Sequence, residues 1–357
     1  MGVRLLRAIV HHMAAVEARV ALSLAPGAEG DRFEVMEPAE SSAYRGPLRA
    51  DDDDGDDDGD GDKPRPARIG GTWYPERYHP APATIDDDDN NNEKAIVLHF
   101  HGGAFVLGDG RERDCGPLAR TMLSTCSATI SHVFCPQYRL ASTAPFPAAL
   151  QDALTAYLHL RRRLRVPARR IVLSGDSAGG NIVNGLLRYL GTYHDGAEET
   201  PPAACAWLWS PWTSPALALV PGRTARSPNR RSDYITERFG AWGYRTYAGR
   251  RRDQGLVDDD GWITAVAANP FPSPAPVWVQ TGARELLLHD NVEFFEGLRR
   301  LNEEKNRAGG VVGQPCELEI VPHAPHDIAL FGHVLGFSRE YAEALKKAEA
   351  FFQRVRK

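Results

Sequence analysis

The chain has 357 residues, of which 42% are apolar and 25% charged, and this is enough apolar material for a sizeable globular core. Its net charge of −5 comes from two aspartate tracts, with nine aspartates in 51–62 and four in 86–89, so that the other 34 acidic residues face 42 Lys and Arg. Composition excludes a fibre, a disordered chain and a membrane span, and the scattered arginines argue against nucleic-acid binding.

The N-terminal stretch 1–20 is basic and apolar, but His11, His12 and Glu17 interrupt its apolar run. This pattern favours an amphipathic helix over a signal peptide, with a mitochondrial presequence as the alternative. The chain has five cysteines and no CxxC pair, which argues against a disulfide framework and a zinc cluster. A reducing, cytoplasmic compartment is therefore expected, and the sequence leaves peripheral membrane attachment open.

Residues 1–65 are predicted to form an N-terminal helical cap segment. Within it, tract 51–62 is expected to be a disordered loop, because aspartates and glycines bury no apolar surface. Tract 86–89 is predicted to be a second polar loop, and the role of both tracts stays open. Residues 66–357 are predicted to form one α/β domain, with an arginine- and aromatic-rich insertion at about 214–262 that suggests a lid.

Short apolar runs alternate with helical patterns through this domain. Six of the runs predict strands, at Ala95–Leu98, Ala128–Phe134, Ile171–Ser174, Ala204–Trp209, Val277–Gln280 and Leu318–Val321. Apolar residues at helical spacing predict helices over 150–158, 181–190, 292–301 and 341–355. This alternation indicates a mostly parallel sheet flanked by helices, with chemistry at the carboxyl ends of the strands.

The strongest motif is Gly175-Asp-Ser-Ala-Gly-Gly180, which lies between a predicted strand and a predicted helix. A sharp strand-to-helix turn forces its central residue into a strained conformation, so the neighbouring residues must be small. The helix N-terminus adds a positive dipole beside a developing oxyanion. The motif therefore predicts a nucleophile elbow with Ser177 as the nucleophile.

A second motif, His101-Gly-Gly-Ala-Phe105, directly follows the first strand of this domain. An acyl-transfer intermediate needs backbone N–H donors at its oxyanion, and paired glycines let the chain approach it closely. Gly102, Gly103 and Ala178 are therefore predicted to form the oxyanion hole.

A serine hydroxyl needs a base, and the base needs an orienting acid. Glu285 follows the strand at 277–280, and both His323 and His326 follow the strand at 318–321. This placement predicts Glu285 as the acid, with Asp290 as the alternative. Either histidine is a candidate base, with His326 preferred.

Several blocks together resemble a known family. HGGAF, Tyr138-Arg-Leu-Ala, Phe146-Pro-Ala-Ala, GDSAGGN and Ser210-Pro-Trp are similar to the hormone-sensitive-lipase-like branch of the α/β-hydrolases, over about residues 94–350. The resemblance implies an α/β-hydrolase fold and a serine carboxylesterase without a metal or cofactor. It also implies a lid built from the N-terminal helices and the insertion, and it favours His326 as the base. Glu285 stands where the family commonly has Asp.

The expected substrates are short-to-medium acyl esters, acetyl esters included, of small apolar molecules. Long-chain triglycerides are disfavoured, because no exposed amphipathic interface is evident in the sequence. Phe105, Trp212, Trp242 and Tyr244 are predicted to line the substrate pocket. Two alternatives stay open: an amide hydrolase that uses the same triad, and a non-catalytic small-molecule receptor of the same fold. The sequence does not predict the oligomeric state.

Overall fold

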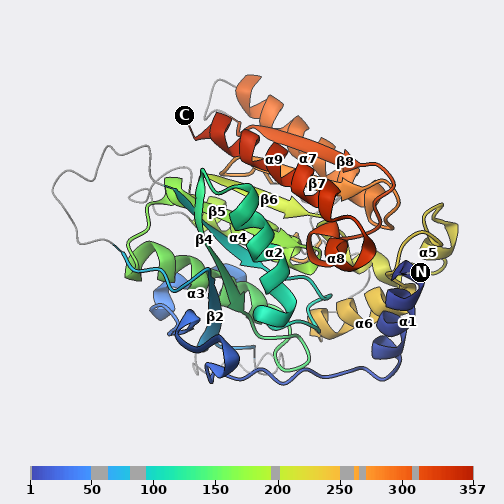
Figure 1. Cartoon of the computed structure of the whole chain (residues 1–357), viewed down its shortest axis with the longest axis horizontal. Coiled ribbons are helices and arrows are strands. Elements are labelled where there is room, and N and C mark those ends of the chain that lie inside the picture. The colour runs from blue at the N-terminus through green and yellow to red at the C-terminus, as the bar shows by residue number, and fades with distance from the viewer. Residues whose placement is uncertain are drawn as a thin grey trace.

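A computed structural model describes residues 2–49, 63–80, 94–193, 202–249, 261–264, 271–307 and 313–356. The two aspartate tracts lie outside the described residues. Within the described part, eight strands form one central sheet (Figure 1). The strands are β1 Phe33–Met36, β2 Ile69–Tyr74, β3 Ala95–Phe100, β4 Ile130–Gln137, β5 Ile171–Asp176, β6 Cys205–Trp209, β7 Val277–Gly282 and β8 Cys316–Val321.

The strand order is β1-β2-β4-β3-β5-β6-β7-β8, and β3 to β8 run parallel to one another. The six predicted strands and the α/β class are confirmed. Strands β1 and β2 were not predicted, and they add an antiparallel edge to the sheet. Strand β1 also changes the description of residues 1–65, because part of that segment belongs to the sheet and not to a helical cap. Strand β1 has four residues, one of them polar, and so short a pattern does not indicate a strand.

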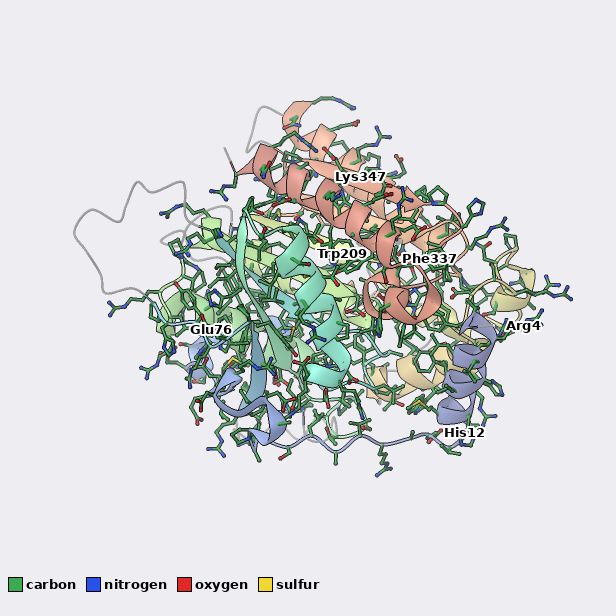
Figure 2. All side chains as sticks on the ribbon, in the orientation of Figure 1. Arg4, His12, Glu76, Trp209, Phe337 and Lys347 are labelled. Atoms are coloured by element: carbon green, nitrogen blue, oxygen red, sulfur yellow. The ribbon has the colours of Figure 1, made fainter. Side chains whose placement is uncertain are left out.

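Helices cover both faces of the sheet. They are α1 Gly2–Ala15, α2 Glu112–Thr125, α3 Ala148–Leu158, α4 Ala178–Tyr193, α5 Arg223–Arg226, α6 Glu237–Ala248, α7 Leu288–Arg307, α8 Ile328–Leu335 and α9 Ser338–Val355. One hydrophobic core joins the sheet to α2, α8 and α9, and the other joins it to α3, α4 and α7. Trp209, at the end of β6, is fully buried near the centre of the molecule (Figure 2).

The insertion that was predicted as a lid forms α5, α6 and a short 3-10 helix, Pro215–Leu219. The N-terminal helix α1 packs on α6 and α8, so two segments that are far apart in the sequence lie side by side at one end of the molecule (Figure 1). None of the helices in the described part of the chain has the length and apolar content to span a lipid bilayer.

Candidate active site

Ser177 sits at the turn between β5 and α4, where its φ is +50°, a left-handed conformation that costs an L-residue about 1–2 kcal/mol. The turn is tight enough to require glycine on either side. A Cβ on Gly175 would lie 2.3 Å from the Gly179 carbonyl oxygen, and a Cβ on Gly179 would lie 1.9 Å from the Phe100 oxygen. The turn that exposes the Ser177 hydroxyl therefore has no room for larger residues at these glycine positions.

His326 lies beside the serine hydroxyl, with Nε2 2.9 Å from the Ser177 Oγ. Both residues are buried, and His326 comes from the loop after β8. His323, in the same loop, is exposed. The structure thus brings together Ser177 and the preferred one of the two candidate histidines.

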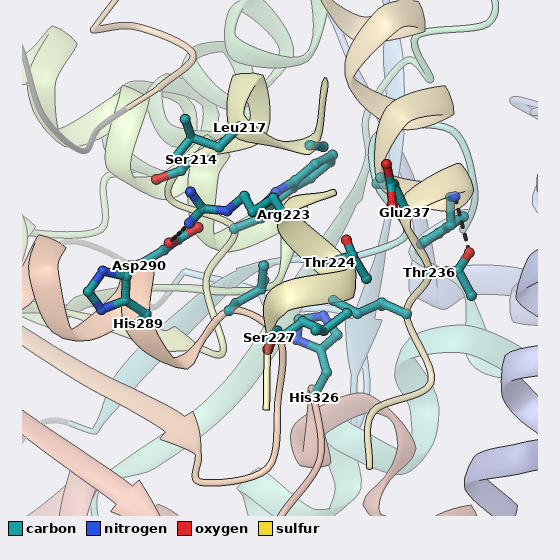
Figure 3. Close-up of a pocket in the computed structure, with 18 of the residues that line it drawn as sticks. Ser214, Leu217, Arg223, Thr224, Ser227, Thr236, Glu237, His289, Asp290 and His326 are labelled. Atoms are coloured by element: carbon teal, nitrogen blue, oxygen red, sulfur yellow. Dashed lines mark hydrogen bonds and ion pairs between the residues drawn. The ribbon is translucent and has the colours of Figure 1, made fainter. Parts of the chain in front are cut away.

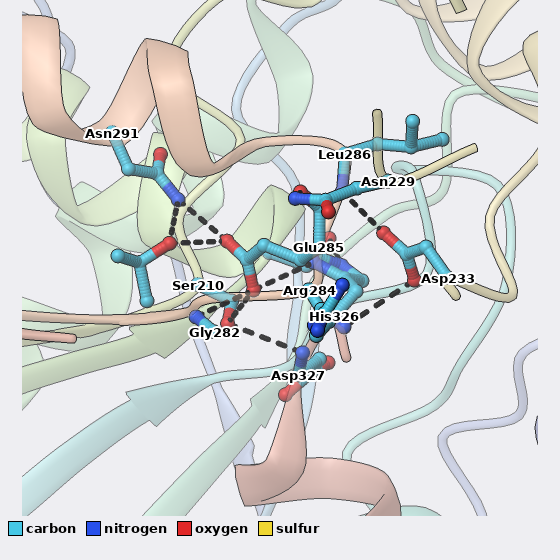
Figure 4. A network of polar contacts seen from close by, with 12 residues as sticks. Ser210, Asn229, Asp233, Gly282, Arg284, Glu285, Leu286, Asn291, His326 and Asp327 are labelled. Atoms are coloured by element: carbon cyan, nitrogen blue, oxygen red, sulfur yellow. Dashed lines mark hydrogen bonds and ion pairs between the residues drawn. The ribbon is translucent and has the colours of Figure 1, made fainter. Parts of the chain in front are cut away.

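Glu285 follows β7 and is completely buried, with its carboxylate Oε2 3.8 Å from His326 Nδ1 (Figure 4). That separation is an ion-pair distance and is too long for a direct hydrogen bond. The carboxylate accepts hydrogen bonds from the Asn291 amide (2.9 Å), the Gly282 N–H (3.1 Å) and two hydroxyls, Thr281 Oγ1 (2.5 Å) and Ser210 Oγ (2.6 Å). These four donors hold the buried carboxylate in one orientation.

The alternative acid, Asp290, lies in α7 and pairs with Arg223 of the insertion. Its pKa is raised to about 6 by burial, and the Arg223 guanidinium opposes that rise. Asp290 therefore serves a charge pair on the wall of the pocket, away from the histidine.

The pKa of His326 is raised to about 9. Burial lowers it, and this effect is outweighed by Glu285 and, further off, by Asp233 and Asp327, whose negative charges favour the imidazolium. The site is therefore built to stabilise a proton on this ring.

A segment of the insertion holds the acid and histidine loops. The completely buried Asp233 accepts hydrogen bonds from the Leu286 N–H (2.5 Å) and the His326 N–H (3.3 Å). Asn229 Nδ2 donates to the backbone oxygen of Glu285 at 2.9 Å. Neither residue was predicted from the sequence, because the spacing of polar residues in an insertion does not show which side chains turn inward.

The N–H group of Gly102 donates to Asp176 Oδ2 at 2.8 Å, so it is not free to bind an oxyanion. This differs from the expected oxyanion hole. The backbone N–H groups of Gly103, Ala104 and Ala178 make no hydrogen bond within the described residues. Ala104, whose φ is +53°, also lines the same cavity as Ser177. The geometry thus offers Ala104 in place of Gly102.

A cavity of about 420 Å³ opens above Ser177 and His326, between the insertion and α7 (Figure 3). Of the four aromatic side chains that were expected to line it, the structure places Trp212 on its wall. Phe105 instead stacks on Tyr247 at 3.7 Å between ring centroids, and Trp242 and Tyr244 are buried in the adjoining core.

The cavity wall combines apolar and polar side chains. The apolar ones include Leu217, Phe239 and Leu287, and the Arg223–Asp290 pair and His289 lie on one side (Figure 3). The cavity therefore suits a mostly apolar molecule with a few polar groups.

Comparison with known proteins agrees with this architecture. A family model described as alpha/beta hydrolase fold matches residues 97–330. Carboxylesterase/phospholipase LipF of Mycobacterium tuberculosis is 30% identical over 202 residues, which is 55% of this chain and 48% of LipF, so the match spans about half of that relative. Human hormone-sensitive lipase is 36% identical over 92 residues, which is 25% of this chain and 8% of the lipase.

An esterase structure from Pyrobaculum calidifontis superposes with a TM-score of 0.62 at 19% identity, over 99% of this chain and 93% of the esterase, and so shares the fold. Since the family model covers more than half of the chain, from within β3 to within α8, the chain belongs to the α/β-hydrolase family, with the resemblance to hormone-sensitive lipase that its motifs indicated.

Proposed function

We propose that this chain is a serine carboxylesterase that hydrolyses short-to-medium acyl esters of small apolar molecules. The observation that carries the proposal is the 2.9 Å contact between Ser177 Oγ and His326 Nε2 at the floor of a largely apolar cavity. A hydroxyl in hydrogen-bond contact with an imidazole, which itself faces a carboxylate, is the arrangement that nucleophilic acyl transfer needs.

In the proposed reaction, Ser177 Oγ attacks the ester carbonyl carbon while its proton passes to His326 Nε2. Glu285 stabilises the resulting imidazolium, and the proton then moves to the leaving alcohol as the C–O bond breaks. A water molecule attacks the acyl-serine by the same route, with His326 as base, and releases the carboxylic acid and free Ser177. The raised pKa of His326 favours the protonated state that both steps form.

Gly103, Ala104 and Ala178 are the proposed oxyanion donors. Their free N–H groups support this assignment, and the use of the Gly102 N–H by Asp176 argues against a direct role for Gly102. Gly102 then has a structural role. A Cβ at that position would lie 2.3 Å from Asp176 Oδ2 and would disturb the loop that carries the donors.

The proposed acyl length follows from the cavity. A volume of about 420 Å³ is at the small end of ligand sites, which supports acetyl to medium-chain esters over long acyl chains. All five cysteines lie in the described part of the chain and none is paired, which supports a reducing compartment such as the cytoplasm.

The test is hydrolysis of p-nitrophenyl acetate, butyrate, octanoate and palmitate by the wild type and by Ser177→Ala, with a matched anilide as a fifth substrate. We expect turnover that is greatest for the shorter esters and is lost by several orders of magnitude in the variant. Equal rates in both proteins would refute the nucleophile assignment. Folded protein without turnover would favour the receptor, and faster anilide cleavage would favour an amide hydrolase.

A further inference from the structure

A groove between α1 and the insertion carries a concentrated positive charge. Five arginines and His11 line it, and Glu237 is the one acidic residue on its wall. The arginines are Arg4 and Arg7 of α1, Arg230, and Arg238 and Arg245 of α6. The charge is thus assembled from two regions that are distant in the sequence, α1 and the insertion.

None of these five guanidinium groups has a carboxylate partner among the described residues. Arg7 donates to the Arg230 carbonyl oxygen at 2.6 Å, and Arg238 donates to the Ala15 carbonyl oxygen at 3.2 Å. These two contacts fasten α1 to the insertion without neutralising either charge. The groove therefore has a positive potential that an anionic partner would complement.

An apolar stripe runs along the outer face of α1, next to this groove. Leu5 and Ile9 are 63% and 47% exposed, and their spacing of four residues places them on one side of the helix. Val16, which is 59% exposed, directly follows the helix. Val334 of α8, 59% exposed, lies close to the start of α1, because a Cβ on Gly2 would contact the Val334 carbonyl oxygen at 3.5 Å. Figure 2 shows Arg4 and His12 of the same helix at the edge of the molecule.

We propose that the stripe and the arginine groove together form a docking surface for an anionic phospholipid bilayer. Exposed aliphatic side chains beside arginines are the features with which a surface helix lies in a bilayer interface. A soluble anion would be bound by the arginines but would leave the apolar stripe unexplained. No exposed amphipathic interface was evident in the sequence, and the exposed Leu5 and Ile9 beside these arginines are the structural observation that supports one.

The docking surface adjoins the candidate active site. The arginine groove and the cavity above Ser177 share Thr224, Thr236 and Glu237 in their walls. A bilayer on the docking surface would therefore lie next to the mouth of the cavity. The docking itself needs no catalysis, so it can be measured whether or not the proposed esterase activity exists.

The test is co-sedimentation of the full chain, as wild type and as Ser177→Ala, with phosphatidylcholine vesicles that contain or lack phosphatidylglycerol. We expect both proteins to bind the anionic vesicles and to bind the neutral ones far more weakly. Each arginine near an anionic surface changes affinity about fivefold, so Arg4→Gln with Arg245→Gln should weaken binding by more than about tenfold. Leu5→Ser with Ile9→Ser should weaken binding at high as well as low salt, because the apolar contact is not screened.

A matched control changes one arginine and one exposed aliphatic residue elsewhere. Arg163 is exposed, and Ile320 in β8 is 42% exposed, so Arg163→Gln with Ile320→Ser should bind as the wild type does. Thermal unfolding checks that each variant is folded. Equal binding to both kinds of vesicle, no binding, or equal loss in the control would overturn the proposal. So would a stable dimer, in light scattering, that Leu5→Ser with Ile9→Ser dissociates.

Discussion

Ser210 connects the two loops that carry the acid and the histidine. It follows β6, and its hydroxyl donates to Glu285 Oε2 at 2.6 Å and accepts from the Asp327 N–H at 3.1 Å. Its side chain is fully buried, so no solvent replaces these bonds when the hydroxyl is removed. Ser210→Ala is therefore a test of how strongly the structure positions the proposed triad.

The size of the effect follows from the two bonds. A hydrogen bond to an ionised group contributes about 1.5–3 kcal/mol, and a buried N–H left unpaired costs about 1–3 kcal/mol. We expect Ser210→Ala to lower the free energy of unfolding by about 3 kcal/mol or more. Because Glu285 and Asp327, the neighbour of His326, both lose an anchor, kcat should fall by about tenfold to a hundredfold. KM should change little, since Ser210 does not line the cavity.

The assays are urea unfolding and steady-state hydrolysis of p-nitrophenyl butyrate. Ser142→Ala is the matched control, because the Ser142 hydroxyl is buried and makes no hydrogen bond within the described residues. That variant should keep the wild-type stability and kcat. If Ser210→Ala loses no more stability or kcat than Ser142→Ala, the hydroxyl does not hold the two loops and the reasoning is refuted.

Three further predictions follow from charges and backbone strain. The esterase reaction needs neutral His326, so kcat/KM should rise with pH toward a pKa of about 9. Asp233→Asn removes a nearby negative charge and should therefore move this rise in the pH profile to lower pH. An unchanged pH profile would contradict the electrostatic argument. In urea unfolding, the free energy of unfolding of Ser177→Gly should exceed that of Ser177→Ala by about 1 kcal/mol, because only glycine relieves the strained φ. Equal stability of the two variants would argue against strain. Arg223→Met leaves Asp290 without its charged partner. The variant should therefore lower the free energy of unfolding more at about pH 8 than at about pH 5, where Asp290 is protonated. A loss of stability that does not depend on pH would count against the ion pair.

The sequence predicted the parts of the site that depend on local backbone geometry. The elbow around Ser177 needs small residues within three positions of the serine, and a strand before it with a helix after it, all of which are visible as a continuous pattern. Glu285 and His326 were predictable because each follows a parallel strand, and such strands end at one edge of the sheet. His323 follows the same strand as His326, so position alone could not show which of the two histidines is the base.

Contacts between segments that are distant in the chain could not be predicted from the sequence. Asp233 looks like any polar residue of an insertion, and only the fold shows that its carboxylate is buried against the His326 N–H. The same holds for Gly102, whose N–H is taken by Asp176, 74 residues further along the chain. The sequence also could not predict which aromatic side chains line the cavity. Phe105 and Trp212 are both apolar rings near the site, and only packing decides which of them faces the cavity.

The insertion does more than cover the cavity. Asp233 and Asn229 bond to the backbone of both the acid loop and the histidine loop, while Thr236 and Phe239, a few residues further on, line the cavity itself. One short segment therefore contacts both the space for the substrate and the backbone that orients the proposed base. A molecule bound in the cavity would therefore contact the same segment whose Asp233 holds the His326 N–H.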